Sequence, residues 1–460
     1  MKEKKRGSFS GSLGFVLAAA GSAVGLGNIW RFPYLAAKDG GGIFLLVYLL
    51  LAVTFGFALL TTEISIGRRT KQSPLTAYGK LKPSWGFLGK LACIVPAIIL
   101  PYYCAIGGWV LRYFAVFVTG NVEIAAEDGN FGSFIANVPT PIVCMLIYLA
   151  ATFIVVYMGV ENGIERCSKI IMPLLLVLII GIGIFGLTIR HTDEAGVTRT
   201  ALEGLKIYVV PSLEGMTLKK FMAVVVDAMG QLFYSLSVAM GIMIAYGSYM
   251  KDDVDINQSI GRIEIFDSLV AFLAGMMIVP TVFAFLGTDG MSAGPSLMFV
   301  TLPKVFNAMG GIGTVIGTVF FVMVLFAALT SSVSILEALV SSLMDQTGMT
   351  RRRACSLYAL AAGVIVCLGY NVLYVEIPLP NGTTAQILDI MDYLSNSILM
   401  PIVSILTCIF IGWVLGPQVV IDEVEKSGKK MSRKRLYIAM VRFVAPILLL
   451  VLLLQSLGVF

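Results

Sequence analysis

The sequence predicts an all-α polytopic membrane protein with eleven transmembrane helices, arranged as two inverted five-helix repeats in which helices 1 and 6 are interrupted. Three observations predict this fold. Hydrophobic residues make up 58% of the 460 residues and charged residues only 13%, a composition typical of polytopic membrane proteins. The chain contains a series of apolar segments long enough to cross a bilayer. Two of them, at corresponding positions of two halves, are interrupted by glycine and polar residues, as in inverted-repeat folds.

The apolar segments run through a single predicted transmembrane domain, residues 1–460. A first repeat covers about residues 13–190, a second about 219–415, and an extra helix follows at about 435–459. A piece at about 294–308 is too short to span and is expected to form a re-entrant or capping helix pair. The eleven segments lie near residues 13–37, 41–67, 86–119, 139–158, 168–190, 219–249, 258–287, 313–345, 352–371, 385–415 and 435–459.

The distribution of Lys and Arg predicts how the helices are oriented. Basic residues gather in the N-terminal tail, in the loops after the second and eighth segments, and at 426–435 after the tenth. Cytoplasmic loops carry such an excess of positive charge. We therefore expect a multi-pass protein of the cell (plasma) membrane, with the N-terminus cytoplasmic and, after an odd number of crossings, the C-terminus outside.

Charge and cysteine usage exclude other classes. The net charge of +6 does not indicate nucleic-acid binding, because the basic residues lie in short loops between apolar segments. The first apolar run is too long for a cleaved signal and lacks a small-residue cleavage site. The cysteines have no CxxC spacing and lie in or beside apolar segments, which predicts free, buried thiols. They are Cys93, Cys104, Cys144, Cys167, Cys355, Cys367 and Cys408.

The first apolar segment contains the stretch GSAVGLGNIWRFP, residues 21–33, with three glycines, Asn28 and Arg31. Glycine weakens a helix, and a break frees backbone groups that in hydrocarbon must line a cavity or bind something. Close helix packing would explain the glycines, but polar residues at the same depth usually mark a pathway. The stretch indicates a broken helix whose carbonyls hold a cation and whose N–H groups hold an anion.

The sixth apolar segment has a similar interruption. Its stretch GQLFYSLSVAMG, residues 230–241, places small and polar residues at the middle of the predicted span. Two Gly/Ser-rich helices can match by chance. The matching positions nevertheless favour an inverted-repeat transporter.

Four motifs together resemble those of the neurotransmitter:sodium symporter family. They are GSAVGLGNIWRFP, GQLFYSLSVAMG, LFAALTSS at residues 325–332 and DIMD at residues 389–392, similar to motifs of the family's first, sixth, eighth and tenth helices. The resemblance runs from Arg6 to about Arg442 and is to bacterial sodium-coupled amino-acid transporters with eleven helices. It implies a leucine-transporter-type fold with substrate and sodium at the middle. Many members have a twelfth helix, which is not predicted here.

The resemblance implies two sodium sites. Na⁺ is a hard cation that prefers oxygen ligands. Spacing supports the second site, because Ala327, Thr330 and Ser331 share one helix face; the alternative is that these hydroxyls bond to their own helix. The first site is expected to use the Ala23 carbonyl, Asn28, Ser235, Asp267 and the substrate carboxylate. The second is expected to use carbonyls of Gly21, Val24 and Ala327 with the hydroxyls of Thr330 and Ser331.

The resemblance also implies an amino-acid site between the broken helices. N–H groups near Leu26 and Gly27 suit an α-carboxylate, to which Tyr103 would donate, and freed carbonyls of the sixth helix suit an α-ammonium. No implied pocket residue is charged, so a charged substrate side chain would be unpaired. Neutral, mainly hydrophobic amino acids are expected. The implied substrate residues are Ser22, Ala23, Gly25, Leu26, Gly27, Ile99, Tyr103, Tyr234, Ser235, Ser237, Ala239, Met240, Ser331 and Ile335; for Met240 and Ile99 the alternative is plain helix packing.

Two charged pairs match the family's gates. Arg31 with Asp392 is expected to close the outer side. Arg6 with Asp345 is expected to close the inner side, beside Phe9 where many members have Trp. Glu63 lacks a water-side location and is expected to hydrogen-bond the broken backbone, while His191 is expected to be solvated in an outer loop without a role.

The function that these features predict is sodium-coupled uptake of amino acids by alternating access, with the bilayer, sodium and the amino acid as partners. Chloride independence is expected, because Asp267 supplies a fixed negative charge and Ala271 stands where chloride-dependent members have Ser. The alternative for Asp267 is that it faces inner water. A sodium-dependent amino-acid sensor is the alternative function. An enzyme is disfavoured by the single, outlying His, and a channel by two discrete breaks in place of a continuous polar lining.

Overall fold

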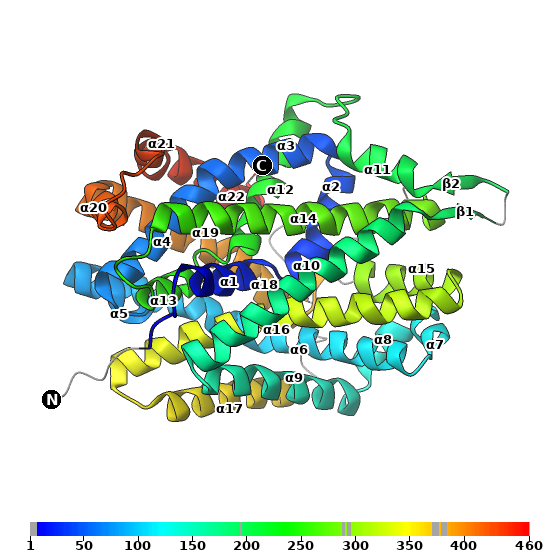
Figure 1. The fold of residues 1–460 in the computed structure, drawn as a ribbon, viewed down its shortest axis with the longest axis horizontal. Helices are drawn as coiled ribbons and strands as arrows, with labels where there is room; N and C mark the ends of the chain where they lie inside the picture. Colours follow the sequence, from blue (N-terminus) through cyan, green and yellow to red (C-terminus); the bar gives the residue numbers. More distant parts are fainter. Residues whose placement is uncertain are drawn as a thin grey trace.

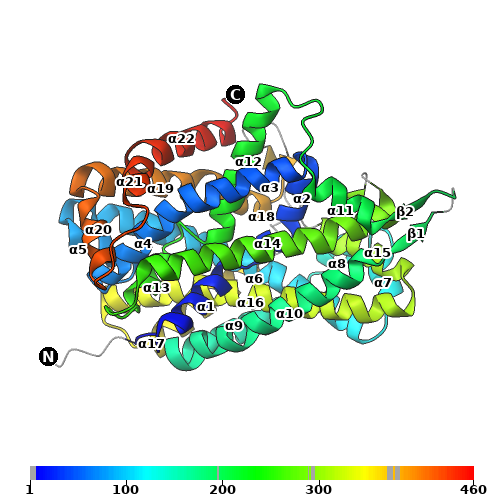
Figure 2. The same ribbon diagram turned by 45° about the horizontal axis from the view of Figure 1, so that its top comes forward.

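The computed structural model describes residues 7–193, 196–287, 290–291, 296–369, 377–378 and 384–459. Long helices lie side by side and run mostly along the longest axis of the molecule (Figure 1). The N-terminus, α5 (Pro74–Leu81) and α20 (Gln418–Glu425) lie at one end, called here the N-terminal end. The antiparallel hairpin β1 (Arg190–Thr192)–β2 (Thr198–Thr200) lies at the opposite end, called the hairpin end (Figure 2).

The apolar segments of the first half are all helical. Short π-helical turns join several of the α-helices, so that one predicted segment often contains two or three named elements. These elements are α1 (Ser12–Ala23), η1 (Gly27–Arg31), α2 (Phe32–Lys38), α3 (Gly42–Leu51), η2 (Ala52–Gly56), α4 (Phe57–Thr70), η3 (Pro83–Trp85), α6 (Gly86–Val118), α9 (Pro139–Tyr157), η4 (Val160–Glu165) and α10 (Arg166–Leu187).

The second half repeats this pattern. Its helices are α12 (Leu218–Leu236), α13 (Ile242–Ser248), α14 (Ile256–Leu286), α16 (Gly311–Thr347), α17 (Arg351–Gly369), α18 (Ile387–Asp392), η8 (Tyr393–Leu399), α19 (Met400–Ile409), η9 (Phe410–Leu415), α21 (Lys434–Ala439), η10 (Met440–Val444) and α22 (Ala445–Ser456). A second, very short hairpin pairs β3 (Ile377–Pro378) with β4 (Thr384–Ala385).

Eight helices in the described residues are long and apolar enough to cross a bilayer, or nine when the bent pair α1/α2 counts as one span. The two remaining predicted segments, 219–249 and 352–371, correspond to the pair α12/α13 and to α17. The boundaries agree within a few residues except in the fifth segment. It begins at Val160 and not at 168, because η4 adds a turn that contains Glu161 and Glu165 and therefore has no apolar signature.

Several short helices were not predicted from the sequence. Residues Leu297–Ala308 are too short to span, as predicted, but η6 (Leu297–Thr301) and α15 (Leu302–Ala308) form one continuous helix and not a pair. The other missed helices, besides α5 and α20, are α7 (Val122–Ala126), α8 (Asn130–Ala136) and α11 (Ala201–Val209). They are too short and too polar to produce an apolar segment.

Packing places the two interrupted helices at the centre. α1 contacts α10, α14 and α16, while α12 contacts α3 and η1. All seven cysteines lie in the described part of the chain and are free thiols, as predicted, but only Cys104, Cys355 and Cys408 are buried, and the other four are partly exposed. α1 and α12 also contact each other. The two interrupted helices therefore lie side by side inside a shell of other helices.

Candidate functional site

The two helix breaks lie against each other. α1 ends at Ala23, and the axis turns by 55° before Gly27. α12 ends at Leu236, after which Ser237 and Ala239 adopt positive φ values of 52° and 65°, a conformation that costs a non-glycine residue about 1 kcal/mol or more. The Ser237 hydroxyl lies 2.9 Å from the Ser22 carbonyl, to which it donates, and 3.0 Å from the Ser22 hydroxyl. The interruptions predicted from sequence are thus tied together.

Glu63 stabilises the break in α12/α13. Its Oε1 accepts a hydrogen bond of 2.6 Å from the backbone N–H of Ala239. The Glu63 side chain is buried, and its Oε2 has no partner in the described structure. The prediction that Glu63 binds the broken backbone is confirmed.

The first predicted sodium site is assembled around Asp267 of α14. Its Oδ1 accepts from Asn28 Nδ2 at 2.9 Å and from Ser235 Oγ at 2.5 Å, and its Oδ2 accepts from Tyr48 OH at 2.9 Å. Asn28, Ser235 and Asp267 have no exposed surface, so the alternative that Asp267 faces inner water is wrong. Tyr48 was missed, since an aromatic residue in an apolar helix carries no signal of its own.

The electrostatics of this cluster favour a cation. The three groups that donate to Asp267 are all neutral, and no ion pair to it is found among the described residues. A buried carboxylate without a counter-charge is costly in a low-dielectric interior. Side-chain oxygens of Asn28, Ser235 and Asp267 are the ligand type that Na⁺ prefers. The residues present therefore fit a sodium ion.

The second predicted sodium site lies where α1 meets α16. A Cβ on Gly21 would lie 3.4 Å from Thr330 Cβ, so these helices are in close contact. Thr330 Oγ1 donates to the carbonyls of Phe326 at 3.2 Å and Ala327 at 3.1 Å. This is the arrangement expected if the hydroxyl bonds to its own helix. Ser331 Oγ instead reaches across to the Ser22 carbonyl at 3.2 Å. Of the five predicted ligands, Gly21 and Thr330 lie close together, the Ala327 carbonyl accepts from Thr330, and Ser331 contacts Ser22 of α1.

A small cavity lies between the breaks, and its lining matches the predicted substrate site. Its volume is about 20 Å³, which is close to the space of one water molecule, so a bound amino acid requires side chains such as Tyr234 or Met240 to move. The one lining residue that was not predicted for any role is Ile242, the first residue of α13. The lining residues are Ser22, Ala23, Gly25, Asn28, Ile99, Tyr103, Tyr234, Ser237, Met240, Ile242, Ser331 and Ile335.

Four predicted substrate residues do not line this cavity. Leu26 and Ala239 are completely buried, and Ser235 belongs to the Asp267 cluster. Gly27 lies under the ring of Tyr234, where an added Cβ would come within 2.3 Å of the ring. Only a glycine allows this close approach.

Tyr103 is the lining residue best placed to bind a ligand. Its hydroxyl is buried and makes no well-formed hydrogen bond among the described residues, although Ser331 and the Leu26 backbone lie nearby. A Cβ on Gly25 would lie 3.2 Å from this hydroxyl. An unsatisfied donor beside the helix break suits an acceptor such as a carboxylate.

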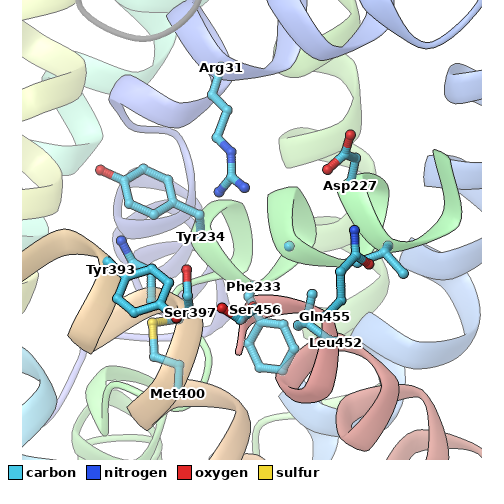
Figure 3. Close-up of a pocket in the computed structure, with 13 residues that line it drawn as sticks. Arg31, Asp227, Phe233, Tyr234, Tyr393, Ser397, Met400, Leu452, Gln455 and Ser456 are labelled. Carbon is cyan, nitrogen blue, oxygen red and sulfur yellow. Dashed lines mark hydrogen bonds between the residues drawn. The ribbon is translucent and has the colours of Figure 1, made fainter. Parts of the chain in front are cut away.

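A larger cavity of about 210 Å³ lies on the other side of Tyr234 and contains Arg31. Figure 3 shows the Arg31 guanidinium pointing into it, with Tyr234 and Asp227 on opposite sides. Asp392 does not form an ion pair with Arg31 within the described contacts; it accepts from Tyr102 OH at 3.0 Å and from Asn396 Nδ2 at 2.5 Å. Both predicted gate residues, Arg31 and Asp392, thus lie near Tyr234, but they do not contact each other as an ion pair.

Only one residue of the other predicted gate, Asp345, belongs to the described part of the chain. Arg6 lies outside the described residues. Asp345 accepts from the Ser73 N–H at 2.7 Å and the Ser73 hydroxyl at 2.5 Å. Phe9 is buried and makes edge-to-face contacts with Phe15, Tyr246 and Tyr249. The resemblance implies Trp at this position in many family members.

His191 is not simply solvated, as the sequence suggested. It lies in β1 and is half-buried, because its ring stacks on Phe285 with 4.4 Å between centroids. This contact attaches the hairpin to the end of α14.

The fold and site define a membrane transporter with a buried carboxylate cluster, suited to a cation, beside a small-molecule cavity. Comparisons with known proteins agree. The sequence model of the "Sodium:neurotransmitter symporter family" matches residues 6–131 and 128–460, so the chain belongs to this family of transporters, which are not enzymes. A multi-pass, sodium-dependent membrane symporter is therefore the class of the protein.

Individual relatives cover nearly the whole chain. The "Uncharacterized sodium-dependent transporter YhdH" of Bacillus subtilis (strain 168) is 32% identical over 100% of this chain and 99% of its own. The "Uncharacterized sodium-dependent transporter MJ1319" of Methanocaldococcus jannaschii is 32% identical over 98% of this chain and 90% of its own. The crystal structure of MhsT in complex with L-phenylalanine superposes with a TM-score of 0.84 at 34% identity, and the match covers 98% of this chain and 100% of MhsT.

Proposed function

We propose that this protein takes up neutral, mainly hydrophobic amino acids together with sodium, by alternating access and without chloride. The observation that carries the proposal is the completely buried Asp267, which receives only neutral donors and adjoins an uncharged cavity between two helix breaks. The complex of MhsT with L-phenylalanine supports an amino acid as the substrate.

Recognition would divide between backbone and side chains. The free Tyr103 hydroxyl and the N–H groups at the start of η1 would bind the α-carboxylate, and the carbonyls freed at residues 237–241 would bind the α-ammonium. Apolar side chains of Ile99, Met240 and Ile335 would surround the substrate side chain. An unpaired charge there costs several kcal/mol, which favours neutral amino acids.

We further propose two sodium ions per transporter. The first would be held by the Ala23 carbonyl, Asn28, Ser235, Asp267 and the substrate carboxylate. The second would be held by the carbonyls of Gly21, Val24 and Ala327 with Thr330 and Ser331, after the Thr330 hydroxyl leaves its own helix.

The proposed architecture is a repeat at about 13–190, its inverted copy at about 219–415 and an extra helix at about 435–459. The protein would lie in the plasma membrane with the N-terminal end in the cytoplasm and the C-terminus outside. The gates would be Arg31 with Asp392 and Arg6 with Asp345.

Replacing sodium should weaken amino-acid binding. Because the ion and the substrate carboxylate would share the first site, each must raise the affinity of the other, by about 5- to 150-fold for typical coupling energies. The measurement is binding of L-phenylalanine to the purified protein in sodium chloride and in choline chloride. A screen of the twenty amino acids by thermal shift under both conditions would name the substrate. Equal affinities in sodium and choline would contradict the proposal.

Substitution of Met240 by phenylalanine should narrow the substrate range towards smaller amino acids. Met240 is buried and lines the cavity, so a larger, stiffer side chain removes space from the substrate. Competition assays should show lost binding of aromatic amino acids and retained binding of alanine. Lysine and glutamate should not compete in either protein, and tight binding of arginine or aspartate would show that the cavity is misassigned.

A sodium-dependent sensor with the same fold is the second candidate. Binding alone does not distinguish it from a transporter. Counterflow of labelled amino acid in liposomes does, because only a transporter exchanges substrate across the bilayer. Absence of counterflow despite sodium-dependent binding would favour the sensor.

A further inference from the structure

The end of α2 is held in a narrow space at the hairpin end. Residues 39–42 pack against the backbone of the last turn of α11 and of the residues just after it, with Gly41 bridged to Pro211. Gly41 has φ of 58°, and a Cβ there would lie 2.0 Å from the Ile207 carbonyl oxygen. α2 also contacts α12. A change of charge at this point therefore acts directly on the contact between the outer halves of the two broken helices.

Two carboxyl groups meet at this contact. Asp39, which caps α2, is 5% exposed, and Lys38 Nζ lies within 4 Å of both its carboxyl and the Asp227 carboxyl of α12. The two carboxyl groups are therefore neighbours on either side of one ammonium group. With both groups ionised, Asp39 Oδ2 has no donor in the described structure. Lys38 Nζ lies 2.7 Å from Asp227 Oδ2 but 3.8 Å from Asp39 Oδ1. One lysine thus compensates Asp227 well and Asp39 poorly.

We propose that Asp39 and Asp227 form a proton-binding pair, in which one shared proton holds the end of α2 against α12 and closes the mouth of the Arg31 cavity. Two neighbouring carboxylates repel each other, whereas one carboxylic acid can donate a hydrogen bond to an ionised neighbour. Asp227 itself lines the cavity, and Figure 3 shows it on the side of Arg31 away from Tyr234. The pair would couple external pH to access from the hairpin end, which goes beyond sodium and amino-acid transport.

Other charged groups around the pair are few; Arg31 lines the same cavity as Asp227. Lys38 and Lys220 favour the ionised form of Asp39, and Tyr34 lies near Lys38. α3 carries no charged residue, and the last two turns of the described α14 carry none. On α11, Glu203 is bonded to the N–H of Thr200; Lys206 is the remaining charge there.

The sign of the pH effect follows from the state of Asp39 in each arrangement. Burial, and then the neighbouring Asp227 carboxylate, raise the pKa of Asp39 to about 7. A water-exposed aspartate, as in an open arrangement, has a pKa of about 3.9. The closed arrangement binds the extra proton between these values, so it is favoured as the pH falls below about 7 and weakened as the pH rises through that value.

Hydrogen exchange of the intact purified protein at pH 6 and pH 8, corrected for intrinsic exchange rates, tests this proposal without any substrate. Amides of residues 39–42 and 207–210 should be several-fold better protected at pH 6 than at pH 8 in the wild type. Asp39→Asn supplies a permanent donor to Asp227, so protection should be equal at both pH values. Asp227→Asn should also remove the difference.

Glu123→Gln is the matched control, because Glu123 is an exposed carboxyl of α7, and it should keep the wild-type difference. The proposal is overturned if the wild type shows no difference, or if Asp39→Asn and Asp227→Asn both retain it. Since exchange is measured without sodium coupling or uptake, its outcome is independent of the proposed transport function.

Discussion

Replacement of Arg68 by methionine should lower the free energy of unfolding by about 3–5 kcal/mol, because it leaves a buried carboxylate without a partner. The Arg68 side chain is completely buried, and Glu423 is 4% exposed. Arg68 Nε donates to Glu423 Oε1 at 2.7 Å, and Nη1 donates to the Val254 carbonyl at 2.7 Å. This single side chain joins α4, α20 and the loop before α14. The unfolding midpoint of the purified protein in detergent measures the effect.

Two further variants show whether the unpaired charge is the cause. Arg68→Met combined with Glu423→Leu should recover most of the stability, since apolar replacement of both partners is often neutral or better. Lys426→Met removes an exposed pair with Asp252, whose side chains are 47% and 50% exposed, and should cost only about 0–1 kcal/mol. If the double variant is as unstable as Arg68→Met, the loss comes from packing and not from the buried charge.

Uptake by the wild type should be equal in sodium gluconate and in sodium chloride. Two sodium ions would bring a charge of +2 into a low-dielectric site, and a zwitterionic amino acid brings no net charge. Asp267 can compensate from within the site, because it is completely buried and held by neutral donors. Ala271 lies one helical turn further along α14 and is also completely buried, where it offers no hydroxyl to an anion.

The double variant Asp267→Asn with Ala271→Ser should make uptake depend on chloride. It removes the fixed charge and adds a hydroxyl that can donate to an anion, so uptake should fall at least about tenfold in gluconate and partly return in chloride. Asp267→Asn alone should lose uptake in both media. A wild type that stalls in gluconate would show that Asp267 does not replace the anion.

Most of the fold could be predicted from the sequence because its signals are local. Apolar segments indicate each long helix, and glycines with polar neighbours at 21–28 and 230–241 indicate the two helix breaks. Most of the cavity lining was implied by the family resemblance that these stretches carry. The predicted helix boundaries were wrong where a helix continues through acidic residues, as at Val160–Glu165. Short polar helices such as α7 and α11 were not predicted.

Only the tertiary structure decided which side chains meet. Asp267 contacts Asn28 at a sequence separation of 239 residues and Tyr48 at 219, and nothing in the spacing of Tyr48 indicates that contact. The distance between Arg31 and Asp392 and the meeting of Asp39 with Asp227 are likewise set by how the helices pack. The sequence by itself determined the helices, their breaks and the chemical types available there. Which atoms share a proton or a cation depends on packing across the bundle, because such contacts act over a few ångströms in space and leave no periodic trace along the chain.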